Sequence, residues 1–163
     1  GMYKMNDLMD ELLSDYQINL QGKAAELFFT TKAGEDEVLL DKTHFTSIII
    51  NLLDNAVKYN HKPQKEIHIT TFNSNERTLT LSICDNGNGM SEKVRRNIFD
   101  RFYRDPSLTR SNEPGLGLGL FFTKQSLDAH KWDVEVKSKE GIGTEFLIHI
   151  PLQNTSLKPA QLN

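Results

Sequence analysis

The chain contains little cysteine and no clustered metal ligands. Cys84 is the only cysteine among 163 residues, so no internal disulfide can form. The five histidines are scattered and make no cysteine–histidine cluster with the spacing of zinc ligands. These shortages exclude a disulfide scaffold and a structural zinc site.

Long apolar runs and an excess of charge are also missing. No apolar run approaches the ~20 residues that a helix needs to cross a bilayer, and the N-terminus has no signal-peptide core. The net charge is −3 and the isoelectric point about 6.0, which argues against nucleic acid or an anionic membrane surface as a partner. We therefore expect a cytoplasmic domain without direct membrane contact. Gly1 precedes Met2 and a helical pattern begins almost at once, so we also expect a longer parent protein, which can itself be membrane-anchored.

The composition, with 37% hydrophobic and 25% charged residues, is typical of a globular domain. Apolar spacing predicts a first helix over Asn6–Leu20, capped by Asn6 or Asp7. Further helices are predicted over Lys42–Asn60, from Ser91, and from Gly115 to about His130. Short β-rich or alternating runs predict strands at Ala25–Thr31, Val38–Asp41, Glu66–Phe72, Thr78–Asp85, Trp132–Ser138 and Thr144–Ile150.

The second helix carries a narrow polar stripe. Asn51, Asn55 and Lys58 fall on one side of it, away from its apolar face. Two carboxamides one turn apart and an ammonium group suit a site where a hard cation takes oxygen ligands and phosphates meet positive charge. The alternative is an ordinary solvated helix face, although such faces more often carry Glu and Lys than paired Asn.

Asp85 ends an apolar strand. Alternation places its carboxylate on the same face as Leu79, Leu81 and Ile83, so it needs a hydrogen-bond donor there. Gly87 follows and would let a ligand approach the backbone, and the amino group of a base would satisfy the carboxylate. The alternative is that Asp85 caps the turn, or the helix that begins near Ser91.

Two glycine patterns lie at later turns. Gly115, Gly117 and Gly119 stand where a polar loop meets a helix, and bare N–H groups there can seat an anion. The alternative is that they only permit an unusual backbone. Gly141 and Gly143, followed by Thr144, fit a bulged hairpin turn and carry less information.

Together, and in this order, these motifs resemble the nucleotide-binding boxes of sensor histidine kinases. The resemblance covers about Asn6 to Leu152 and implies the Bergerat-type ATP-binding fold shared with gyrase, the Hsp90 chaperones and MutL. That fold is α+β, a two-layer sandwich of a mixed, mostly antiparallel sheet with helices on one face. We expect an ATPase domain over residues 1–152 and a disordered tail over 153–163. The motifs are Asn51-Leu-Leu-Asp-Asn55-Ala-Val-Lys58-Tyr59, Asp85-Asn-Gly87-Asn-Gly89, Phe99-Asp-Arg-Phe102-Tyr-Arg104, Gly115-Leu116-Gly117-Leu118-Gly119 and Gly141-Ile-Gly143-Thr144.

The resemblance implies ATP and magnesium as cofactors and a role for each matching residue. Asn55 would bind the magnesium ion with Asn51 beside it, Lys58 would contact phosphate, and Tyr59 would line the nucleoside. Asp85 would accept from the adenine amino group, directly and through water near Thr144, with room for the base at Gly87 and Gly89. The remaining ATP-binding residues would contact the phosphates, Arg104 when a mobile lid over Asp105–Pro114 closes. They are Gly115, Leu116, Gly117, Leu118, Gly119 and Arg104.

The chain departs from the family pattern in two turns and in its histidines. It has His61-Lys62-Pro63 where a glycine is usual, and His130-Lys131-Trp132 where His-Gly-Gly is usual. The phospho-acceptor of the family is a histidine followed by an acidic residue and then proline, and none of the five histidines has that context. We therefore expect the acceptor on a separate dimerisation segment of the same parent protein, and a response regulator as the downstream partner.

The function implied is that of a histidine protein kinase catalytic domain, with Asn55 and Arg104 as catalytic residues. It would position Mg-ATP for transfer of the γ-phosphoryl group to that separate histidine. One alternative is a chaperone- or clamp-type ATPase of the same fold, which would need a glutamate base near Asn55 and a second domain. The only acid nearby in the sequence is Asp54. The other alternative is a non-catalytic ATP-binding interaction module.

Overall fold

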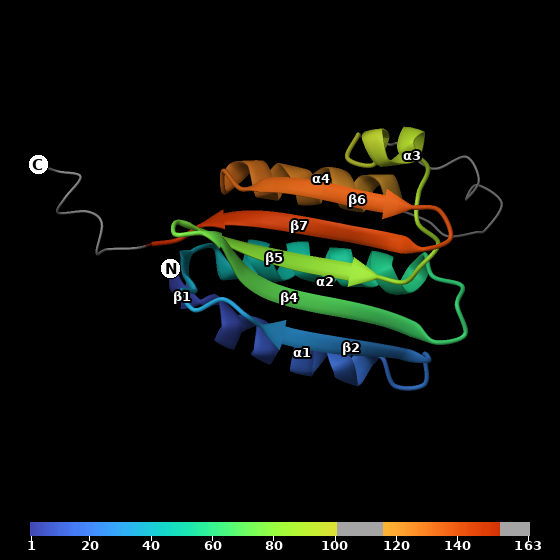
Figure 1. Ribbon diagram of the computed structural model, residues 1–163, viewed down its shortest axis with the longest axis horizontal. Helices are drawn as coiled ribbons and strands as arrows, with labels where there is room; N and C mark the ends of the chain where they lie inside the picture. The colour runs from blue at the N-terminus through green and yellow to red at the C-terminus, as the bar shows by residue number, and fades with distance from the viewer. Residues whose placement is uncertain (101–115, 154–163) are drawn as a thin grey trace, which may run out of the picture.

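The computed structural model describes residues 1–100 and 116–153, with the backbone alone at 116–119, and forms two layers. Figure 1 shows the sheet in front and the helices α1, α2 and α4 together behind it, with α3 at one end. The helices are α1 (Met5–Asn19), α2 (Lys42–Lys58), α3 (Glu92–Asn97) and α4 (Leu116–Ala129). The strands are β1 (Met2–Lys4), β2 (Ala25–Thr31), β3 (Glu37–Leu39), β4 (Lys65–Asn75), β5 (Thr78–Asp85), β6 (Asp133–Lys139) and β7 (Gly143–Pro151).

The main sheet has five strands in the order β2-β4-β5-β7-β6. Only the β2–β4 pair is parallel, and the other three pairs are antiparallel. Both predicted hairpins, β4–β5 and β6–β7, are present, and the mixed sheet with helices on one face confirms the predicted fold class. A separate small sheet pairs β1 with β3.

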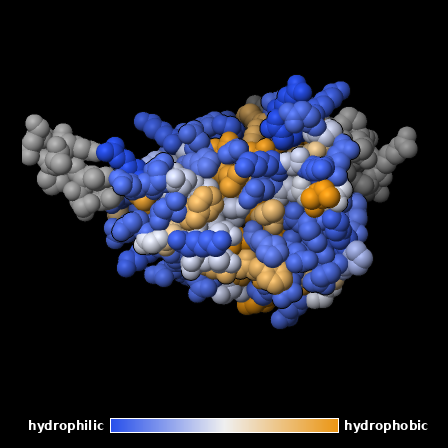
Figure 2. All heavy atoms as spheres, in the orientation of Figure 1, coloured by the Kyte–Doolittle hydropathy of each residue, from blue (hydrophilic) through white to orange (hydrophobic). Residues whose placement is uncertain are grey.

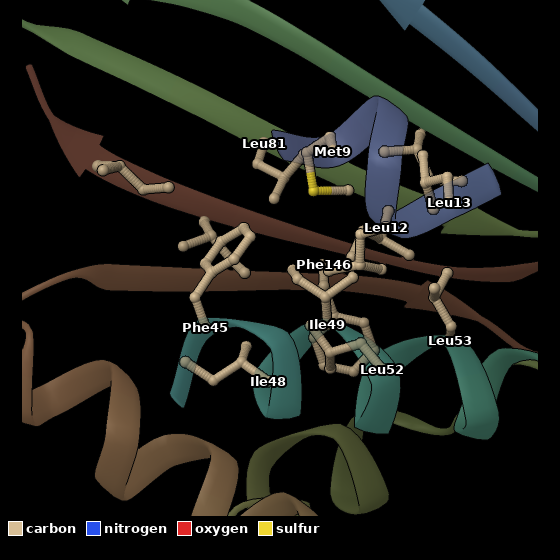
Figure 3. Close-up of a cluster of buried hydrophobic side chains, with 14 of the residues drawn as sticks. Met9, Leu12, Leu13, Phe45, Ile48, Ile49, Leu52, Leu53, Leu81 and Phe146 are labelled. Atoms are coloured by element: carbon tan, nitrogen blue, oxygen red, sulfur yellow. The ribbon is translucent and has the colours of Figure 1, made fainter. Parts of the chain in front are cut away.

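The core lies between the sheet and the helices. The apolar face predicted for α2 is buried, since Phe45, Ile48, Ile49, Leu52 and Leu53 are at most 1% exposed. Figure 3 shows these side chains facing Met9, Leu12 and Leu13 of α1 and Leu81 and Phe146 of the sheet. The opposite face of the sheet is mainly hydrophilic in Figure 2, as expected for strands buried on one side only.

One predicted helix cap and one predicted strand end are wrong in detail. Neither Asn6 nor Asp7 caps α1, which begins at Met5. The Asn6 carboxamide instead donates to Ala33 O and accepts from the Thr71 hydroxyl, so tertiary contacts compete successfully for a side chain that could have capped the helix. Asp41, predicted as the end of a strand, caps α2 by accepting from His44 N at 2.9 Å.

None of the helices in the described part of the chain has both the length and the apolar character needed to cross a membrane. The predicted tail begins at Gln153, which still donates its N–H to Glu37 O at 3.0 Å. Residues 154–163, the rest of that tail, lie outside the described residues.

Candidate functional site

Three polar residues lie side by side at one end of the sheet. Asp85 is paired with Thr144 across β5 and β7, and Thr144 is paired with Ser138 across β7 and β6. Because paired residues point to the same face, all three side chains lie on the helix-covered side, where the core ends. The row therefore places the Asp85 carboxylate beside Thr144, with Ser138 one strand further along, at the boundary of the core.

The Asp85 carboxylate is held by backbone donors. Its Oδ1 accepts from Gly87 N at 2.8 Å and from Thr144 N at 3.3 Å. The first bond is the turn cap foreseen as an alternative, but the α3 helix is capped by Ser91 itself. Both hydrogen bonds that the described residues make to this carboxylate end on Oδ1, so capping the turn leaves Oδ2 able to accept from a ligand.

Burial changes the acidity of this carboxyl group. It raises the pKa of Asp85 from 3.8 to about 6, against the opposing effects of the Gly87 and Thr144 N–H groups and the charge of Lys62. The carboxylate is thus ionised at neutral pH but incompletely solvated. A ligand that donates a hydrogen bond would recover part of the lost solvation.

Three glycines surround Asp85 because the backbone is close-packed there. A Cβ at Gly87 would lie 2.8 Å from Asp85 Oδ1 and from Tyr59 O. Gly89 has φ +67° and a Cβ would lie 1.9 Å from a β6 carbonyl oxygen, while Gly143 has φ +148° and a Cβ would lie 2.0 Å from Asp85 O. Packing alone explains all three glycines, and the predicted role of Gly87 and Gly89 in making room for a base remains a prediction.

The helices α2 and α4 lie antiparallel. Near the start of α2, the Phe45 ring packs on Trp132, just past the end of α4, with centroids 6.1 Å apart. Two turns later, the Asn51 amide donates to Thr123 Oγ1 of α4 at 3.3 Å. As residue numbers rise along α2, their partners on α4 fall.

This pairing predicts what lies beside the polar stripe. If this pairing continues one to two turns beyond Asn51, we expect the backbone of Leu116–Gly119 to lie beside Asn55 and Lys58. Both of these side chains are half-buried, and Lys58 Nζ lies 5.5 Å from the centroid of the Tyr59 ring. The carboxamide–ammonium stripe and the first turn of α4 thus lie on the same side of the sheet, at the Asp85 end.

The sequence interpretation missed the residues that join α2 to β5. Asn60 is 1% exposed, and its amide donates to Asn86 Oδ1 at 2.8 Å. Asn86 also accepts from Glu66 N and donates to Gln64 O. Two asparagines directly after Tyr59 and Asp85 were the available signal, because Asn is common where side chains replace backbone hydrogen bonds.

A third asparagine joins the surrounding loops. The Asn88 N–H donates to Tyr59 O at 3.1 Å, its Oδ1 accepts from His61 N at 3.2 Å, and its carbonyl accepts from Gly141 N at 2.7 Å. Lys62 Nζ donates to Gly141 O at 3.1 Å and so links the segment after α2 to the β6–β7 turn. The end of α2, the β5–α3 loop and the β6–β7 turn therefore form one connected rim.

Asp54 does not face this rim. Its Oδ1 accepts from the Tyr16 hydroxyl at 2.6 Å, which ties α2 to α1. Burial and this hydrogen bond raise the pKa of Tyr16. The only acidic residue next to Asn55 in the sequence is therefore engaged in a hydrogen bond between α1 and α2.

Several predicted residues cannot be placed. Arg104, Gly115 and the predicted lid Asp105–Pro114 lie outside the described residues. Within the described ranges, no group of three or more His, Cys, Asp or Glu could hold a metal ion by itself. A magnesium ion at Asn55 would need oxygen ligands from a bound phosphate chain or from water.

Comparison with known proteins identifies the family. Residues 40–154 match the family described as histidine kinase-, DNA gyrase B-, and HSP90-like ATPase. Sensor protein RprX of Bacteroides fragilis is 31% identical over 148 residues, which are 90% of this chain and 28% of that protein. Sensor histidine kinase YvrG of Bacillus subtilis is 33% identical over 137 residues, 84% of this chain and 23% of that protein. The chain thus spans about a quarter of the length of these relatives.

Solved structures agree with this assignment. A mycobacterial sensor histidine kinase, MprB, superposes with a TM-score of 0.78 at 26% identity, covering 95% of this chain and 100% of that one. The catalytic domain of histidine kinase ThkA has a TM-score of 0.77 at 22% identity, covering 93% of this chain and 97% of that one, and shows the shared fold. The chain therefore belongs to the histidine kinase-, DNA gyrase B- and HSP90-like ATPase family, within which it is similar to the ATPase domains of sensor histidine kinases.

Proposed function

We propose that residues 1–152 are a catalytic domain that binds Mg-ATP and transfers its γ-phosphoryl group to a histidine on a separate helical segment of the same parent protein. The observation that carries the proposal is the half-buried Asp85 carboxylate, held on Oδ1 at the end of the sheet, near the α2 end that carries Asn55 and Lys58. An acceptor, a carboxamide pair and an ammonium group in that order suit the base, metal and phosphates of one nucleotide.

The adenine end would be read by Asp85. Its Oδ2 would accept from the exocyclic amino group, and the Thr144 side chain would act beside it through water. Because guanine carries a carbonyl oxygen at that position, it would bring an acceptor to an acceptor and bind poorly. Gly87 and Gly89 would let the base approach the backbone, and Tyr59 would line the nucleoside.

The phosphate end would be held by α2 and the first turn of α4. Asn55 would supply an oxygen ligand to magnesium with Asn51 next to it, and Lys58 would neutralise phosphate charge. The backbone N–H groups of Gly115 and of the first turn of α4, Leu116–Gly119, would bind phosphate oxygens. When bound, magnesium neutralises charge on the phosphates, and Arg104 would meet the charge of the γ-phosphoryl group during transfer.

The position of Asp54 favours a kinase over a chaperone- or clamp-type ATPase. The latter needs a carboxylate base beside the metal-binding asparagine to activate water. Asp54 is the nearest acid in sequence to Asn55, and Tyr16 holds it at the α1 side of α2. A phosphoryl transfer that takes its acceptor and base from another segment has no such requirement.

The partners proposed are the dimerisation helices that carry the acceptor histidine, and a response regulator that receives the phosphoryl group. A solved histidine kinase of the same fold, ThkA, is in complex with the response regulator protein TrrA, at 21% identity and a TM-score of 0.74. We further propose a cytoplasmic location for this domain and no direct contact with membrane or nucleic acid, consistent with a net charge of −3.

Labelling with radioactive Mg-ATP tests this function. The chain alone should bind nucleotide without acquiring acid-labile, base-stable phosphate, because none of its five histidines has the acceptor context. When the dimerisation helices of the parent protein are added, they should become labelled. Labelling should be slower than in the intact protein, because the two segments are no longer covalently linked. Arg104→Ala should slow this transfer more than it weakens binding. Labelling of a histidine in the isolated chain at a comparable rate would overturn the proposal.

A further inference from the structure

Ser138 lies next to the residues proposed to read adenine, although no role has been given to it above. It is the cross-strand partner of Thr144 and is half-buried on the same face of the sheet. Its Oγ lies 2.8 Å from Met90 N, 3.1 Å from Gly143 O and 2.8 Å from Thr144 Oγ1. One hydroxyl group therefore makes three hydrogen bonds.

The directions of these hydrogen bonds follow from counting protons. A serine hydroxyl has one proton to donate and two lone pairs that accept. The Met90 N–H can only donate to it, and the Gly143 carbonyl can only accept from it. The single Ser138 proton is thus directed to Gly143, and the contact with Thr144 is a hydrogen bond only if Thr144 is the donor.

This direction fixes what Thr144 can offer to a ligand. With its proton committed to Ser138, the Thr144 hydroxyl retains only acceptor lone pairs. The neighbouring Asp85 is also an acceptor when ionised. The water proposed beside Thr144 would donate one proton to each of these acceptors, which leaves it only lone pairs. Asp85 and this water then match an amino group, which has two N–H donors, and oppose a carbonyl oxygen.

We propose that Ser138 is a positioning residue that sets purine specificity, by holding the Thr144 hydroxyl as an acceptor so that the site prefers a 6-amino to a 6-oxo purine nucleotide. This inference rests on the proposed binding of ATP at Asp85 and Thr144. Ser138 itself need not touch the nucleotide. Without it, the Thr144 hydroxyl can rotate and donate to that water, which then has a proton to donate to a 6-oxo group.

The test compares ATP with ITP, which has the same sugar and phosphates but a 6-oxo purine. The ratio of their affinities is measured by calorimetry, in magnesium, for the 163-residue chain and for Ser138→Ala. Ser138→Ala should reduce the preference for ATP about three- to tenfold, the range expected for one hydrogen bond. Ser138→Thr, which keeps a hydroxyl, should restore most of the preference.

A second pair of variants distinguishes this role of Ser138 from a loosening of the β6–β7 turn. In Thr144→Val there is no hydroxyl to orient, so adding Ser138→Ala should leave the ATP-to-ITP ratio unchanged. The role of Ser138 would be overturned if Ser138→Ala reduced the preference for ATP equally in the unmodified chain and in Thr144→Val. It would also be overturned if Ser138→Ala left the preference unchanged in the chain that retains Thr144. Equal affinity of the unmodified chain for ATP and ITP would instead overturn the proposed adenine recognition itself.

Discussion

The Tyr16 hydroxyl donates to Asp54 Oδ1 at 2.6 Å and so joins α1 to α2. Tyr16 is 5% exposed, whereas Asp54 is exposed, so the hydrogen bond lies where the helix pair meets solvent. The contact fixes the helix that carries Asn51, Asn55 and Lys58 from its far side. Because Asp54 is turned away from the proposed site, losing this hydrogen bond should affect the stability of the fold and not the affinity for nucleotide.

Tyr16→Phe should therefore destabilise the fold without weakening ATP binding. Loss of one hydrogen bond to a partly exposed charge should lower the free energy of unfolding by about 1–2 kcal/mol. Urea denaturation and calorimetry with ATP measure the two effects. Tyr3→Phe is the matched control, because the Tyr3 hydroxyl has no hydrogen-bond partner among the described residues. A fall in ATP affinity, with stability unchanged, would place Asp54 in the site instead.

Lys131→Gly should stabilise the protein. Lys131 has φ +60°, a left-handed conformation that costs a side-chain-bearing residue about 1–2 kcal/mol. Because glycine also gains entropy in the unfolded state, we expect a net gain of up to about 1 kcal/mol. Thermal unfolding measures this. Lys131→Ala keeps the Cβ and should show no gain, so equal stability of the two variants would refute the explanation from backbone strain.

The raised pKa of Asp85 predicts how stability depends on pH. Folding raises this pKa from 3.8 to about 6, so the folded state is favoured when the group is protonated, and that stabilisation is lost as pH rises through about 6. Asp85→Asn should thus be more stable than the unmodified chain at pH 8, by about 1–3 kcal/mol, and the difference should shrink toward pH 4. Urea denaturation at both pH values measures it.

Asp133→Asn provides the control for this experiment, because Asp133 is exposed on β6. It should change stability little at either pH. A stability difference for Asp85→Asn that stays constant between pH 4 and pH 8 would contradict the assigned burial of this carboxylate.

Asn55→Ala should weaken ATP binding mainly in the presence of magnesium. It removes a proposed oxygen ligand of the metal, and each 1.4 kcal/mol lost weakens binding about tenfold. We expect about a tenfold loss or more in magnesium and a much smaller one in EDTA, measured by calorimetry. Asn19→Ala, at the exposed end of α1, should bind ATP normally. An equal loss with and without magnesium, together with a lower melting temperature, would mean that Asn55 is structural.

Local sequence patterns predicted the helices and strands, and which face of each one its side chains occupy. Alternation in Thr78–Asp85 correctly placed Asp85 with Leu81 and Ile83, and helical spacing identified the buried face of α2. These features depend only on the geometry of one strand or one helix. The family resemblance named the nucleotide-binding motifs, and the structure brings Asp85 and Thr144 of those motifs into contact.

Contacts between distant segments could not be predicted in this way. Nothing local indicates that β2 pairs in parallel with β4, or that Asn6 contacts Thr71 instead of capping its helix. The Asn60–Asn86 bond and the direction of the Ser138–Thr144 bond likewise depend on which strands become neighbours. Sequence patterns show which face a side chain occupies, whereas its partner is set by the tertiary fold.

The most direct test of the central claim is calorimetric titration of the chain with ATP and with GTP, each with magnesium and with EDTA. We predict saturable, magnesium-dependent binding of ATP, weak binding of GTP, and loss of this discrimination in Asp85→Ala, which removes the proposed acceptor for the amino group. Failure to bind ATP in magnesium, or equal affinity of the unmodified chain for the two nucleotides, would contradict the account.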